Sequence, residues 1–205
     1  MREIWHSPRL RAMLATLGIT LLVIAPLLAY VLRNGLPWGR SALVFAAVLG
    51  LWFVTYAPLH ELTHMLALFM AGGSPAGWRF VPRYWTGDFR SAFVTARDLT
   101  DSQTLVTVAA PYVRDLLLAP AGAVLLAGGA ARRLFPAALL LAVACLGSVY
   151  DVASNFWGYL RYDAGDFAVL ARVAGPGWAV GLGVAATAAG VIGGAVALRR
   201  RPADR

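Results

Sequence analysis

The fold is decided by residues 41–71, which read SALVFAAVLGLWFVTYAPLHELTHMLALFMA. The stretch contains a single charged residue, Glu61, and as a helix it is long enough to cross the roughly 30 Å hydrocarbon core of a membrane. Within it, residues 60–64 read HELTH, an H-E-x-x-H pattern that takes two of the three histidines in the chain. This pattern on an apolar helix predicts a metal site inside a membrane.

The composition of the whole chain is typical of a membrane protein. Hydrophobic residues make up 60% and charged residues 14% of its 205 residues, far from the average of soluble domains. No Pro/Ser-rich or charge-rich linker divides the chain, so we expect a single domain over residues 1–205. We predict an all-α integral membrane bundle with about five transmembrane helices, at residues 12–32, 41–71, 104–130, 134–160 and 178–198.

The basic residues do not indicate a nucleic-acid partner. All 18 of them are arginine, and the net charge is +8. They are scattered over the loops between the apolar segments, whereas a DNA-binding surface needs a basic stripe with a recognition element. Arginine used without lysine suggests a GC-rich bacterial source, so we expect the bacterial cytoplasmic membrane as the location.

His60 and His64 are the first candidate metal ligands. They are four residues apart, so on a helix both imidazoles project from one face and can hold one metal ion. Imidazole and carboxylate ligands suit zinc, and we expect one Zn²⁺ per chain, although iron, cobalt and manganese accept the same donors. Glu61 then lies beside the metal, where its carboxylate can take a proton from water and pass it to a leaving amine. The alternative is that both histidines are hydrogen-bonded polar residues of a helical bundle.

A catalytic zinc site needs a third protein ligand and one open position. We predict Asp151, in the fourth apolar segment, as this ligand. Asp115 in the third segment is the alternative ligand. Asp163 and Asp166 rank lower because they follow Arg161 in an expected interfacial loop.

Two polar residues near these carboxylates are candidates for supporting the reaction. Asn155 lies one helical turn beyond Asp151, and Arg114 precedes Asp115 in a segment that two prolines interrupt. Either side chain can stabilise the oxyanion of a tetrahedral intermediate if it lies close enough. The structural alternative for Arg114 is an intramembrane ion pair with Asp151.

A hydrophobic segment with His60, Glu61 and His64, a middle segment, and then a segment with an aspartate resembles the site-2 protease (M50-type) intramembrane zinc metalloproteases. The resemblance covers residues 41–160, as a divergent member, because the family's Gly directly after the aspartate is replaced here by Val152. It implies that two histidines and a distant aspartate, mapped onto Asp151, hold zinc while the glutamate acts as the base.

The polar stretch between the second and third segments predicts a short interfacial β-hairpin. Its strands are expected at residues 78–85 and 89–97, joined by a turn at 86–88. Pro82 would confine the first strand to an edge, and such an edge can hold an extended peptide by backbone hydrogen bonds. A loop that anchors the bundle through aromatic and arginine side chains is the alternative.

Taken together, the sequence favours an intramembrane zinc metalloprotease that hydrolyses peptide bonds in or near a transmembrane segment of a membrane-protein substrate. The expected partners are that substrate and the lipid bilayer. Two alternatives remain open: a zinc-binding membrane protein without protease activity, and a structural or transport-related helical bundle that holds no metal.

Overall fold

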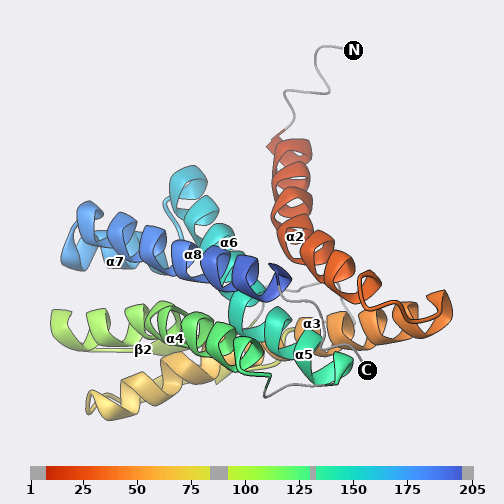
Figure 1. Ribbon diagram of the computed structural model, residues 1–205. Helices are drawn as coiled ribbons and strands as arrows, with labels where there is room; N and C mark the ends of the chain where they lie inside the picture. Colours follow the sequence, from red (N-terminus) through yellow and green to blue (C-terminus); the bar gives the residue numbers. More distant parts are fainter. Residues whose placement is uncertain (1–7, 84–91, 130–132, 200–205) are drawn as a thin grey trace.

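The computed structural model describes residues 8–83, 92–129 and 133–199, and these form a helical bundle with one small sheet (Figure 1). The elements are α2 (Pro8–Leu32), α3 (Trp38–Met70), β1 (Pro75–Arg79), β2 (Phe93–Ala96), α4 (Asp101–Ala127), α5 (Leu134–Leu140), the π-helical segment (Leu141–Leu146), α6 (Gly147–Tyr162), α7 (Asp166–Ala174) and α8 (Pro176–Arg199). The π-helical segment joins α5 to α6, so these three elements form one continuous helix, Leu134–Tyr162.

Four helices in the described ranges are long and apolar enough to cross a membrane: Trp38–Met70, Asp101–Ala127, Leu134–Tyr162 and Pro176–Arg199. The expected first crossing lies in α2, whose apolar part, Leu17–Leu32, is a shorter helix. The prediction of a mostly helical bundle with a small sheet is therefore confirmed, with four long apolar helices where about five were expected.

Glycines allow α8 to pack closely against its neighbours in the centre of the bundle, where α4 and α8 lie side by side (Figure 1). A Cβ at Gly193 would come within 2.9 Å of the Ala119 carbonyl oxygen in α4. A Cβ at Gly190 would come within 2.8 Å of the Cys145 carbonyl oxygen. Larger residues at these two positions would push the helices apart, because no backbone atom can give way cheaply in a packed interior.

The start of α4 is fixed to the end of α3. Thr100 caps α4: its hydroxyl accepts from the Gln103 backbone N–H (3.3 Å), and the Gln103 side-chain oxygen accepts from the Thr100 backbone N–H (3.0 Å). The amide nitrogen of Gln103 also donates to the carbonyl oxygen of Ala71, just past α3 (3.0 Å). This contact fixes how far α3 and α4 are shifted along their axes relative to each other.

The sheet differs in position from the predicted hairpin. β1 pairs with β2 in antiparallel fashion, with Trp78 opposite Val94, but β1 already ends at Arg79, before the predicted end at residue 85. Pro82 is fully buried beyond the end of the strand. Because proline has no N–H to donate to a ladder, the strand stops ahead of it. Residues 84–91, which include the predicted turn, lie outside the described residues.

Candidate metal centre

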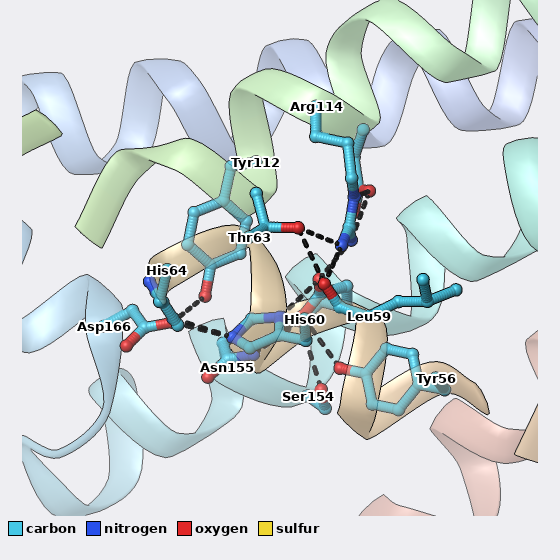
Figure 2. A network of polar contacts seen from close by, with 12 residues as sticks. Tyr56, Leu59, His60, Thr63, His64, Tyr112, Arg114, Ser154, Asn155 and Asp166 are labelled. Carbon is cyan, nitrogen blue, oxygen red and sulfur yellow. Dashed lines mark hydrogen bonds and ion pairs between the residues drawn. The ribbon is translucent and has the colours of Figure 1, made fainter. Parts of the chain in front are cut away.

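Three donor atoms from α3 and α7 converge at one point inside the bundle. The Nε2 atoms of His60 and His64 are 3.1 Å apart, and Oδ2 of Asp166 lies 3.1 Å from the first and 3.2 Å from the second (Figure 2). Zinc–ligand bonds of roughly 2.0–2.1 Å at tetrahedral angles separate the donors by about 3.3 Å. The three groups, two of them buried, are therefore already spaced as ligands of a single metal ion, and the cluster can hold one.

Local backbone geometry explains how these donors meet. His60 and His64 lie one turn apart on α3, so their rings project from the same face. The chain then reverses after α6 through Asp163 (φ 47°) and Gly165 (φ 81°), which both adopt the left-handed region. Asp166 follows as the first residue of α7, and the reversal directs its carboxylate back towards α3. Glycine is suited to this turn because a positive φ costs it nothing sterically.

The other polar atom of each histidine ring has a partner of its own. Nδ1 of His60 lies 2.8 Å from Oδ2 of Asp151, and Nδ1 of His64 lies 2.8 Å from the carbonyl oxygen of Thr107. Both partners are acceptors, so each Nδ1 carries the proton and each Nε2 directs a lone pair into the cluster. This is the tautomer that a metal ligand requires.

The hydroxyl of Tyr112 supports the third donor. It lies on α4, is fully buried, and donates to Oδ2 of Asp166 at 2.9 Å. With Oδ2 accepting this hydrogen bond, the carboxyl group of Asp166 is held facing the two Nε2 atoms, and its carboxylate form can bind a cation.

The structure assigns the two aspartates differently from the sequence prediction. Asp151 was expected to be the third ligand, but its carboxylate contacts Nδ1 of His60, on the opposite edge of the ring from the Nε2 atom that faces Asp166. One metal ion on both Nε2 atoms is reached by Asp166 and not by Asp151. Sequence spacing cannot tell which edge of an imidazole a carboxylate will meet, because this depends on how α6 packs against α3. Asp163 stays exposed at the end of α6.

Asp151 is instead a fully buried carboxylate that accepts several hydrogen bonds. Besides His60, Oδ1 accepts from the Tyr56 hydroxyl (2.8 Å) and from the Asn155 amide (2.9 Å), and Oδ2 accepts from Arg114 (3.4 Å). Asn155 and Arg114, which were candidates for stabilising an oxyanion, are thus both directed at Asp151. The ion pair between Arg114 and Asp151, given as the alternative, is present.

Asp115, the alternative ligand, lies in an ion pair away from the donor cluster. Nε and Nη2 of Arg114 donate to its Oδ1 at 2.9 and 2.7 Å. Nη1 of the same guanidinium donates to the Leu59 carbonyl oxygen and to the Thr63 hydroxyl, both at 2.9 Å (Figure 2). Arg114 therefore links α3, α4 and α6 and balances two carboxylates at once.

Glu61 shares a cavity with the donor cluster. The cavity has a volume of about 360 Å³ and lies between α3, α6 and the loop that leads to α7. A water molecule or substrate that enters it meets Glu61 and two of the donors together. Its walls are formed by Tyr56, Ala57, His60, Glu61, Ala92, Ser154, Asn155, Gly158, Tyr162, Ala164, Gly165 and Asp166.

Sequence reasoning missed three contributors to the site. Asp166 was ranked low because it follows a loop, although a glycine directly before an aspartate at the start of a short amphipathic helix is a signal for a tight reversal. Tyr112 and the carbonyl of Thr107 gave no signal, because a tyrosine or a backbone group in an apolar helix looks like ordinary packing.

Comparison of the chain with protein-family models, with curated proteins and with solved structures found no match.

Proposed function

We propose that this protein is an integral membrane zinc metalloprotease that hydrolyses peptide bonds in or near a transmembrane segment of another membrane protein. The observation that carries the proposal is the donor cluster of His60, His64 and Asp166, with donors 3.1–3.2 Å apart and both Nδ1 atoms already engaged. Four long apolar helices and the resemblance of the HELTH segment to site-2 proteases support the membrane setting.

Each residue has a definite chemical task in this proposal. His60, His64 and Asp166 hold the metal. Zinc bound there supplies a Lewis acid that polarises water and the peptide carbonyl. Glu61, on the wall of the same cavity, accepts a proton from water and delivers it to the leaving amine. Asp151 keeps the Nδ1 proton of His60 in place, so that Nε2 remains free for the metal.

The test is a paired measurement of zinc content and proteolysis on detergent-purified protein, with a single-span membrane protein as substrate. Glu61→Gln is expected to keep about one zinc per chain and to lose cleavage by at least about 100-fold, in the range of a lost general base. His60→Ala is expected to lose both. Unimpaired cleavage by Glu61→Gln would remove Glu61 as the base, and a folded wild type without metal would favour the structural or transport-related bundle.

One observation favours a second candidate, a zinc-binding membrane protein without protease activity. Arg114 and Asn155, the side chains expected to stabilise an oxyanion, are both engaged with Asp151. In this second case the purified protein would contain one zinc per chain, and neither the wild type nor Glu61→Gln would cleave any membrane-protein substrate.

A further inference from the structure

The donor cluster lies near one end of the bundle. His64 comes six residues before the end of α3 at Met70, and Thr107, its partner, comes six residues after the start of α4 at Asp101. With a rise of 1.5 Å per residue, both positions lie roughly 9 Å from these helix ends. Asp166 lies outside the four helices that are long and apolar enough to span a membrane. The cluster is therefore closer to the loops than to the middle of the bundle.

The cavity beside the cluster reaches the surface at the same end. Tyr162, at the end of α6, is 53% exposed, and Ala164 and Gly165 in the following loop are exposed as well. Ala92, directly before β2, lines the cavity on the side of the sheet. Three of the described rim residues, Ala92, Ala164 and Gly165, have small side chains or none.

Towards the middle of the bundle the cavity ends in tightly packed side chains. The Tyr56 ring, which lines the cavity, contacts Trp52 and Tyr150 with ring centroids 5.8 and 5.0 Å apart. The Trp52 and Tyr150 rings are themselves 5.1 Å apart. Asp151, next to Tyr56, is completely buried and receives donors from several sides. This wall separates the cavity from the centre of the bundle along its axis.

Backbone energetics favour a substrate that is already extended at this depth. A peptide bond inside a helix has its carbonyl and N–H engaged in intrahelical hydrogen bonds. Unwinding the helix in hydrocarbon leaves those groups without hydrogen-bond partners, which is unfavourable for each of them. Beyond the end of a transmembrane helix, water and the walls of the cavity can satisfy them.

We infer that the cavity takes its substrate from the loop end, as an extended segment directly beyond the end of a transmembrane helix. This rests on the proposed function and narrows it: the scissile bond lies in the boundary segment and not in the apolar middle of the helix. The segment enters between the end of α6 and Ala92 and runs inwards past Glu61 to Ser154.

The route is tested by thiol labelling in vesicles of phosphatidylcholine and phosphatidylglycerol, with a membrane-impermeant sulfonated maleimide on both sides. The single native thiol, Cys145, is buried and gives the background rate. Ala164→Cys probes the rim and Ser154→Cys the inner wall. Leu118→Cys is the matched control: its side chain is 40% exposed, but it lies 17 residues into α4.

We expect both cavity thiols to react at least tenfold faster than the thiol at position 118. Labelling at position 164 together with background rates at position 154 would overturn the inference, because the inner cavity would then not be reached from the loop end. This measurement needs no proteolysis, so it stands apart from the proposed activity.

The substrate class is tested with two synthetic single-span peptides in the same vesicles. Both carry an apolar helix of about 20 residues. One continues into a Gly/Ser-rich flank, and the other continues as an alanine-rich helix. We expect cleavage within the first few flank residues and at least tenfold faster turnover of the peptide with the unwound flank. Cuts in the middle of the apolar helix, or equal rates for both peptides, would overturn the inference. If neither peptide is cut while zinc is retained, the proposed protease activity fails, and the substrate assignment fails with it.

Discussion

Two polar clusters lie side by side in this protein and share His60 as a neighbour, but they differ in how their charge is balanced. The donor cluster of His60, His64 and Asp166 directs three lone-pair atoms at one point and contains no positive side chain of its own. The ion-pair network of Arg114, Asp115 and Asp151 contains a guanidinium that contacts both carboxylates. The difference teaches that a carboxylate already balanced by an arginine has less to gain from a bound cation than one without a positive neighbour.

The largest effect is expected at Asp166, the proposed third ligand. Asp166→Ala is expected to lower zinc affinity by more than about 100-fold, above the range for loss of an outer partner, because it removes a donor from the cluster. Zinc content after dialysis against a chelator of known affinity measures the change. Asp163→Ala, in the same loop, is the control and should keep its zinc. Equal losses in the two variants would assign the effect to the loop instead of the donor.

A large effect on the free energy of unfolding is expected in the ion-pair network of Arg114, Asp115 and Asp151. Arg114→Met leaves Asp115 and Asp151 without their shared cation, and breaking a buried ion pair from one side costs about 3–5 kcal/mol. Oδ2 of Asp115 already has no hydrogen-bond partner among the described residues, so little remains to compensate. Denaturant unfolding in detergent micelles measures the loss. The double variant Arg114→Met/Asp115→Asn should recover part of it; no recovery would argue against charge balance as the cause.

An intermediate effect on zinc affinity is expected at Asp151, which contacts His60 of the donor cluster. Asp151→Asn keeps the shape of the side chain but removes the charge that faces Nδ1 of His60, and loss of an outer partner of a metal ligand typically costs about 10–100-fold in affinity. Zinc titration of the purified variant measures it. If Asp151→Asn lowered affinity as much as Asp166→Ala, Asp151 would have to be counted as a ligand after all.

The smallest effect on zinc affinity is expected from Tyr112→Phe. This change removes one hydrogen bond to Oδ2 of Asp166 and leaves the ring in place against Phe167, so the fold should be retained. We expect zinc affinity to fall by about tenfold, at the lower end of the range for outer partners. The visible spectrum of the cobalt-substituted protein provides a second measurement, which should shift in this variant. An unchanged spectrum and unchanged affinity would mean that Asp166 is positioned by the histidines alone.

The sequence predicted the elements whose signal is local. The apolar runs gave the long helices, because burial of apolar side chains in lipid or in a bundle depends on little beyond composition and length. The HELTH segment gave His60 and His64 on one helix face, because helical periodicity fixes the relative direction of residues four apart. The first strand lies earlier in the chain than the predicted residues 78–85 and ends at Arg79, ahead of Pro82, which has no N–H to donate to a ladder.

What the sequence by itself determined is therefore the apolar helical architecture and the pair of histidines with Glu61 beside them. Only the tertiary structure decided that Asp166, 102 residues from His64, completes the donor cluster while Asp151 orients His60 from the opposite edge of its ring. The physical reason is that a metal site depends on the directions of its donor atoms and on their positions within a few tenths of an ångström. These directions come from the way α3, α6 and α7 pack together after the chain reversal at Gly165, and no local sequence pattern encodes that packing.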